Sequence, residues 1–354
     1  DISNNNRKLI MGFDKKLNLF IKTMEGISIE KDIFLPEICG RESFSKSCVF
    51  LIYFMDYIYG YIVIDYDVSK IMHIEGIAKI LGENFFKLII IDSLSTEMTE
   101  IKKRSEEIEK ELVFAELLQK NIIPYRPPSE NIAFYFKFKE KIGGDFFDFI
   151  GFRERDWTGI FIADVSGHGI PTAIITSVLK SSILQLRNFI ASPNDFLMNL
   201  NDTIYAMCRE GFFVTGFYGI IKQNEKKLLF SVAGHNLPYA ITSDKVFLIE
   251  SKLSSMPLGV LTSDELKSTG KDYKNEEFLL DNTKKLIFYT DGLVDISSKY
   301  NPENTSEDYL LKSLFLRLKD ESPWNFVENV KNSIISFHGN DDFEDDITLV
   351  CVDL

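Results

Sequence analysis

Hydrophobic and polar positions divide the chain into three stretches with different periodicities. In residues 48–65, β-branched and aromatic residues dominate, which predicts two strands joined by a turn at Met55-Asp56-Tyr57. Residues 69–90 carry apolar side chains at helical spacing, which predicts a helix. Residues 1–93 therefore mix strand and helix signals, and we expect them to form an α/β domain.

The second stretch, residues 94–122, has the periodicity of a coiled coil. Its seam residues follow one another at alternating spacings of four and three: Leu94, Met98, Ile101, Ser105, Ile108, Leu112, Ala115, Gln119 and Ile122. Glu and Lys fill the other faces, and Pro124 ends the helix. We predict a helical linker over residues 94–124 that forms a homodimer. A single amphipathic helix packed on its own chain is the alternative.

The third stretch, residues 125–354, alternates short apolar strands with helical segments. The predicted strands are 132–138, 146–150, 159–164, 216–221, 228–233, 286–290 and 346–352. The predicted helices are 171–190, 193–208 and 322–337. This order predicts an α+β domain in which sheets pack on each other with helices outside.

Composition and charge narrow the classes of function. The formal net charge is -13 and the sequence pI is near 5.0, with no basic run, which argues against nucleic-acid binding. No apolar run approaches the roughly 18 residues that a membrane helix needs, so we expect no membrane segment within the chain. The chain begins with Asp1 rather than Met, so an upstream segment stays possible.

The four cysteines are scattered and form no C-x-x-C pair. They are Cys39, Cys48, Cys208 and Cys351. This pattern argues against a disulfide framework or a zinc site and favours a reducing, cytoplasmic compartment.

Aspartates at strand ends are the candidate chemistry. Asp164 and Asp291 each close an apolar strand, whereas Asp145 and Asp345 each come where a strand begins. Because the end of one antiparallel strand lies beside the start of its neighbour, these carboxylates can meet at one rim. Clustered carboxylates repel one another unless cations lie between them, and all-oxygen ligation favours Mg²⁺ or Mn²⁺ over zinc. For any one of these aspartates, a turn or helix-cap role is the simpler explanation.

The motifs around these aspartates resemble, in order, those of the SpoIIE/RsbU-type PPM serine/threonine phosphatases. They are Gly143-Gly144-Asp145-Phe146-Phe147-Asp148, Ala163-Asp164-Val165-Ser166-Gly167-His168-Gly169, Thr290-Asp291-Gly292 and Asp345-Asp346-Ile347-Thr348. Intervening segments also match: Thr215-Gly216-Phe217-Tyr218, Ala233-Gly234-His235-Asn236 and Pro257-Leu258-Gly259. The resemblance runs from about Leu112 to the C-terminus and implies a PPM β-sandwich flanked by helices over residues 125–354.

The resemblance also implies roles for single residues. Asp164 would bridge two Mg²⁺ or Mn²⁺ ions, and the carbonyl oxygen of Val165 would bind one of them. Asp291 and Asp345 would hold the second ion, and Asp145 would bind through water or as an outer ligand. The activated water would hydrolyse a phosphoprotein, in this family a STAS-type anti-sigma-factor antagonist, under control of the linker and the N-terminal domain.

Three histidine and arginine positions need separate interpretation. His168 is a candidate general acid, and shaping of its Gly-His-Gly loop is the equal alternative. His235 is expected to be structural. Arg126, beside the prolines, is expected to be a surface residue rather than a phosphate ligand.

Other functions stay open as alternatives. Gly143-Gly144-Asp145-Phe146 is similar to the signature turn of diguanylate cyclases, but Phe146 stands where an acidic residue is required. A PPM-fold scaffold without turnover and a metal-dependent phosphodiesterase or nuclease are the remaining alternatives. The pattern of residues 48–90 resembles the closing half of a GAF-like or periplasmic-binding-like sensory domain, and a plain dimerisation domain fits almost as well.

Overall fold

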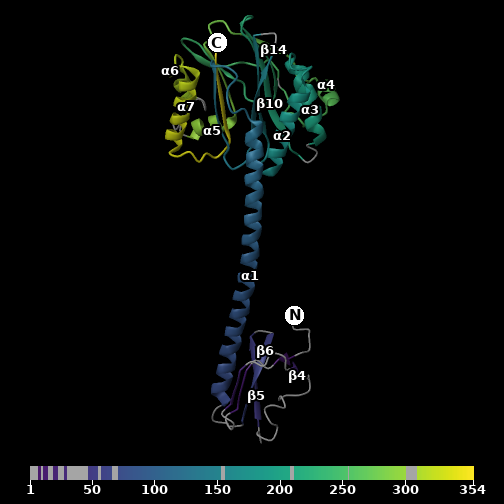
Figure 1. Cartoon of the computed structure of the whole chain (residues 1–354), viewed down its shortest axis with the longest axis vertical. Coiled ribbons are helices and arrows are strands. Elements are labelled where there is room, and N and C mark those ends of the chain that lie inside the picture. The colour runs from purple at the N-terminus through teal and green to yellow at the C-terminus, as the bar shows by residue number, and fades with distance from the viewer. Residues whose placement is uncertain are drawn as a thin grey trace. The chain divides into compact units, whose positions relative to one another are not determined.

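The structure is a computed structural model. It describes residues 7–8, 11–14, 19–22, 28–29, 47–54, 57–65, 71–152, 156–207, 211–253, 255–299 and 309–354. The chain divides into two compact units, Asp1–Ser105 and Glu106–Leu354. Figure 1 shows the elements of each unit along the chain.

The described residues of the first unit form three two-stranded antiparallel pairs. The pairs are β1 (Arg7–Lys8) with β4 (Ser28–Ile29), β2 (Met11–Asp14) with β3 (Leu19–Lys22), and β5 (Ser47–Phe54) with β6 (Tyr57–Asp65). The last pair confirms the two predicted strands, with an irregularity in register between Ile52 and Tyr53. Of the predicted turn, residues 55 and 56 lie outside the described residues, and Tyr57 already belongs to β6.

One long helix, α1 (Ile71–Ile122), replaces the two helical segments that the sequence pattern separated. Residues 91–94 read Ile-Asp-Ser-Leu, with neither Pro nor Gly, so nothing there interrupts the backbone hydrogen bonds. The helix ends at Ile122, two residues before Pro124, as predicted. Among the described residues, no helix is long and apolar enough to cross a membrane.

Two five-stranded antiparallel sheets form the centre of the second unit. The first has the order β14 (Glu276–Leu279), β11 (Lys227–Ala233), β10 (Val214–Lys222), β9 (Trp157–Val165) and β8 (Asp145–Gly151). The second has the order β13 (Val246–Leu248), β12 (Tyr239–Ile241), β15 (Lys285–Tyr289), β16 (Ile347–Asp353) and β7 (Ile132–Lys137).

Helices cover the outer faces of both sheets (Figure 1). On the first sheet lie α2 (Ile170–Gln185) and α3 (Pro193–Met207), with the short α4 (Ser263–Ser268) against α3. On the second lie α5 (Asp291–Lys299), α6 (Tyr309–Arg317) and α7 (Pro323–His338). This arrangement confirms the predicted α+β fold of packed sheets with helices outside.

Strand β15 contributes side chains to both hydrophobic cores of the second unit. Leu286 and Phe288 belong to the core that the two sheets enclose together with α2 and α3. Ile287 and Tyr289 point the other way, into the core under the C-terminal helices. Side chains alternate across a strand, so a strand buried on both faces carries apolar side chains at successive positions, as Leu286 to Tyr289 do.

Candidate metal centre and active site

Asp145 and Asp164 lie directly opposite each other on neighbouring strands. They are register partners in the antiparallel pair β8–β9, and Thr215 is the partner of Asp164 on the other side, in β10. The start of β8 therefore does lie beside the end of β9, as the sequence pattern predicted. Asp145 is buried and Asp164 is half-buried.

Asp145 connects the two sheets. The hydroxyls of Thr290 and Thr348 each donate to its Oδ2 at 2.6 Å. Thr348 lies in β16 of the second sheet, and Thr290 directly follows β15 of the same sheet. Burial raises the pKa of Asp145 well above its usual range, and the charges of Asp346 and Asp164 add to the shift. Its position behind the rim fits an outer ligand better than a direct one, because Oδ2 already accepts two hydrogen bonds.

Asp346 fixes the Gly-Gly-Asp loop from the opposite sheet. Its Oδ2 accepts the amide of Gly144 at 2.7 Å and that of Asp145 at 3.2 Å, while its Oδ1 accepts the amide of Lys139 at 2.8 Å. From the sequence, its neighbour Asp345 is the expected ligand, and no role is predicted for Asp346. The signal in the sequence is the adjacent pair Asp345-Asp346 at the start of a strand. Neighbouring side chains of a strand point to opposite faces, so the two carboxylates are expected to have different partners.

Asp291 and Asp345 form the exposed part of the rim. Asp291 is the first residue of α5, and a Cβ added to Gly292 would lie 2.1 Å from the carbonyl oxygen of Asp346 and 3.2 Å from Cβ of Asp345. The two loops are therefore in close contact at a glycine. Although part of Asp291 is exposed, the loops around its carboxyl partly desolvate it and raise its pKa, and the neighbouring charges of Asp345 and Asp295 raise it further.

The charges of this rim converge on Asp164. Burial raises the pKa of its carboxyl to about 7, with further contributions from Asp291, Asp345 and Asp346. In the part of the chain that the structure describes, no three His, Cys, Asp or Glu side chains are already drawn together as a metal cluster. The donor set nevertheless fits a hard divalent cation, because all these groups offer oxygen and repel one another without a positive charge between them.

Gly144 leaves space in front of the carbonyl oxygen of Val165. A Cβ at this position would lie 2.5 Å from the Val165 carbonyl oxygen and 3.1 Å from Oδ1 of Asp164. Only glycine leaves both oxygens accessible from this side. The residues expected from the sequence at the metal site thus lie around one another: Asp145, Asp164, Val165, Asp291 and Asp345.

The structure separates the two histidines of the motifs. His168 is exposed between Gly167 and Gly169, whose φ angles of 95° and 85° favour glycine. His235 is buried, and its Nδ1 lies 2.8 Å from the hydroxyl of Thr215. His168 is exposed in the loop that follows Asp164 and Val165, whereas His235 is buried beside Thr215.

Comparison with known proteins identifies the family. The model of the family described as Stage II sporulation protein E (SpoIIE) matches residues 154–354, more than half of the chain. The chain belongs to the SpoIIE family. It is a PPM-type serine/threonine phosphatase.

Two curated relatives and two solved structures are similar to this SpoIIE-family chain. Phosphoserine phosphatase RsbU of Bacillus subtilis is 23% identical over 254 residues, 69% of this chain and 70% of RsbU. Phosphoserine phosphatase RsbP of the same organism is 26% identical over 52% of this chain and 45% of RsbP. The SiaA-PP2C domain of Pseudomonas aeruginosa has a TM-score of 0.58 at 19% identity, covering 71% of this chain and 98% of that domain. A SpoIIE phosphatase-domain structure from B. subtilis has a TM-score of 0.51 at 18% identity, covering 63% of each chain. These structures share the PP2C fold.

In this SpoIIE-family phosphatase, the end of α1 is bonded to the Gly-Gly-Asp loop. Gln119 is buried; its Nε2 donates to the Gly143 carbonyl at 2.7 Å and lies 3.0 Å from the Thr176 hydroxyl. The Gly143 amide donates back to Gln119 Oε1 at 3.2 Å. The heptad spacing predicts Gln119 as a polar position within the coiled-coil seam. The structure gives it a tertiary contact with its own catalytic domain instead.

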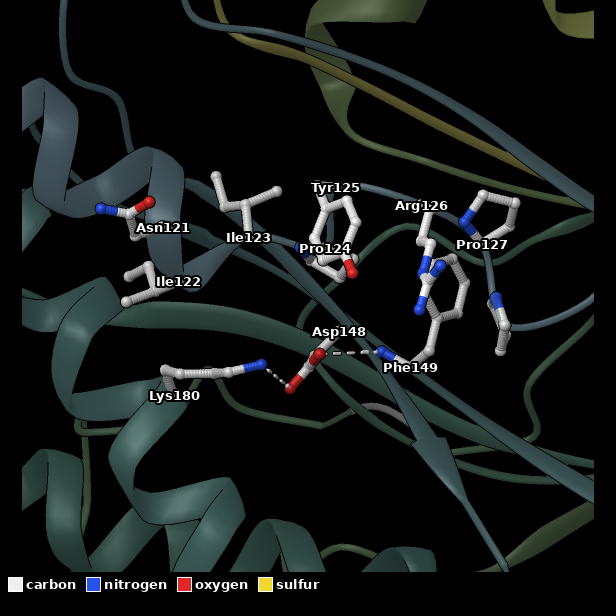
Figure 2. Close-up of a pocket in the computed structure, with 11 residues that line it drawn as sticks. Asn121, Ile122, Ile123, Pro124, Tyr125, Arg126, Pro127, Asp148, Phe149 and Lys180 are labelled. Carbon is white, nitrogen blue, oxygen red and sulfur yellow. Dashed lines mark hydrogen bonds and ion pairs between the residues drawn. The ribbon is translucent and has the colours of Figure 1, made fainter.

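A shallow groove of about 340 Å³ lies where α1 ends (Figure 2). Its floor includes an ion pair in which Lys180 Nζ lies 2.8 Å from Oδ2 of Asp148, while Asp148 Oδ1 accepts the Phe149 amide at 3.0 Å. Arg126 also lines the groove, over the ring of the exposed Tyr125. The groove joins α1, the proline turn, β8 and α2, and it contains none of the rim aspartates.

Proposed function

We propose that the chain hydrolyses phosphoserine or phosphothreonine on a partner protein with two divalent cations, Mg²⁺ or Mn²⁺, at the aspartate rim. The convergence of charge on Asp164 carries this proposal, because carboxylates from two separate loops add to the effect of burial in raising its pKa. As for the family, we take the substrate to be a STAS-type anti-sigma-factor antagonist. A scaffold has no need for such repulsion, which costs stability unless cations offset it.

The proposed ligands divide by exposure. Asp164 and the Val165 carbonyl lie at the inner edge of the rim, next to Gly144, and Asp291 and Asp345 lie at its exposed edge. When bound, the cations would supply positive charge for the phosphoryl oxygens and activate the hydrolytic water. Asp145, held by Thr290 and Thr348, would orient a water ligand from behind.

His168 is the chain's own candidate for proton transfer. It is exposed in the loop that follows Asp164 and Val165, so it can approach a leaving group at the rim. We propose that it protonates the serine or threonine oxygen as the phosphate leaves. Loop shaping by the two flanking glycines would persist without the imidazole, so His168→Asn separates the two roles.

The exposed half of the seam favours a homodimer through α1. Leu94, Met98, Ile101 and Ile108 are each more than half exposed. Such a row of apolar side chains is expected to be covered by a second copy of the helix. From Leu112 onward the seam is no longer open, since Gln119 is buried against the catalytic domain.

The direct test is phosphate release from a phosphoserine protein in the presence of Mn²⁺. Asp164→Asn should abolish activity, while Asp281→Asn, an exposed aspartate away from the rim, should leave it unchanged. Equal activity of wild type and Asp164→Asn would overturn the proposed mechanism. A wild-type protein that binds Mn²⁺ yet releases no phosphate would favour the scaffold instead.

A further inference from the structure

His235 lies behind the aspartate rim and contacts Thr215. The residue is only 9% exposed, and its Nδ1 lies 2.8 Å from Oγ1 of Thr215. Among the described residues no hydrogen bond of normal geometry reaches its buried Nε2, although the backbone of Tyr289 lies close enough to raise its pKa.

Thr215 connects this imidazole to Asp164. The two residues are register partners in the β9–β10 pair, and the Thr215 hydroxyl donates to the Asp164 carbonyl oxygen at 3.5 Å. A threonine hydroxyl has one hydrogen. If that hydrogen points to Asp164, the short contact between Thr215 and His235 requires a proton on Nδ1.

The turn before His235 directs its side chain toward this strand. Gly234 has a φ of 68°, and a Cβ there would lie 2.9 Å from the ring of Pro257. Gly234 also forms a parallel bridge with Gly216, the residue that follows Thr215. The imidazole interacts as well with the backbone of Tyr289, two residues before Asp291. It therefore lies between the strands that lead to Asp164 and to Asp291.

The imidazole is neutral in this environment. Burial lowers its pKa to about 4, and the backbone of Tyr289 opposes that shift only in part. A neutral ring carries one N–H, so Nδ1 donates to Thr215 only in the tautomer that leaves Nε2 without a proton.

We propose that His235, acting through Thr215, is a positioning residue that holds the Asp164 segment of β9 in the geometry that binds the divalent cation. This inference rests on the proposed function of the rim. Residues that bond to a metal ligand rather than to the metal itself typically lower metal affinity or activity by about 10–100-fold when they are removed.

Paired substitutions separate positioning from packing. Thr215→Val keeps the shape of the side chain and removes the hydroxyl, whereas Thr215→Ser keeps the hydroxyl. His235→Phe keeps a planar ring and removes both nitrogens. Each variant is titrated with Mn²⁺ by calorimetry without substrate, and its melting temperature is measured in EDTA.

We expect Thr215→Val and His235→Phe each to weaken Mn²⁺ binding by about tenfold or more, and Thr215→Ser to stay within about twofold of wild type. The double variant should be no weaker than either single variant, since both break one link. Wild-type Mn²⁺ affinity in folded Thr215→Val would overturn the inference. A different result would contradict the proposed function: wild-type protein that neither binds Mn²⁺ nor releases phosphate.

Discussion

Gln119 on α1 and Gly143 in the Gly-Gly-Asp loop exchange two hydrogen bonds, at 2.7 and 3.2 Å, inside the catalytic unit. Gly143 stands two residues before Asp145, and the next residue, Gly144, is held by Asp346. The last turns of α1 are therefore attached to the segment that carries the buried carboxylate of the site.

The first prediction concerns this attachment. Gln119→Ala leaves the buried amide and carbonyl of Gly143 without their partner, which should cost about 1–3 kcal/mol of unfolding free energy. Lys120→Gln is the matched control, because the side chain of Lys120 is exposed and pairs with Glu116 on the same helix. Chemical denaturation measures both. An unchanged unfolding free energy for Gln119→Ala would show that the contact is dispensable.

The second prediction uses Gly144, which directly precedes β8, and Gly151, the last residue of β8. Gly144→Ala places a Cβ 2.5 Å from the Val165 carbonyl oxygen, whereas Gly151→Ala meets nothing within 4 Å. A shift of about 1 Å at a catalytic group can cost roughly 10²-fold in rate. We expect Gly144→Ala to lose phosphatase activity on that scale and Gly151→Ala to retain it. Equal activities would show that the space beside Val165 is not needed.

The third prediction is a pH dependence of stability from His235. Its pKa falls from 6.5 in the unfolded chain to about 4 in the folded protein. Between those values the unfolded chain binds more protons, so folding stability rises with pH across this window and is lost as pH falls below 6.5. Between pH 7.5 and pH 5 the loss should be about 2 kcal/mol.

His235→Phe should remove this part of the pH dependence. The rim carboxylates titrate in both proteins, so the difference between wild type and variant isolates the imidazole. Denaturant unfolding at the two pH values, in EDTA, provides the measurement. The same pH dependence in both proteins would mean that His235 is solvated or protonated when folded.

The fourth prediction tests the exposed seam of α1. Ile101→Asp with Ile108→Asp buries two charges in a dimer interface, so the double variant should be monomeric by light scattering. Lys103→Asp with Lys110→Asp has the same seven-residue spacing on the opposite side of the helix and should stay dimeric. Persistence of a dimer in the Ile101/Ile108 variant would exclude this seam as the interface.

The aspartate rim could be predicted from the sequence because each aspartate stands directly at the end of an apolar strand. Asp145 and Asp164 each follow or precede an apolar strand, and antiparallel pairing then brings them together. The seven predicted strands of residues 125–354 all exist for the same reason. Resemblance to the family supplied the individual ligand roles, which remain proposals.

The contacts between distant elements could not be predicted from local patterns. Gln119 occupies a regular seam position, and nothing in its neighbours indicates a bond to Gly143. Strands β12 and β13 have only three residues each, too few for an alternating pattern. Helix α5 begins Asp291-Gly292, a turn-like pair, and becomes helical where Gly292 packs against Asp346.

The fifth prediction tests the central claim, that the aspartate rim binds divalent cations. Crystals grown with Mn²⁺ and measured at the manganese absorption edge locate the ions directly by anomalous scattering. We predict two peaks between Asp164, Asp291 and Asp345, one of them also next to the Val165 carbonyl oxygen. Peaks away from these residues, or none at saturating Mn²⁺, would contradict it.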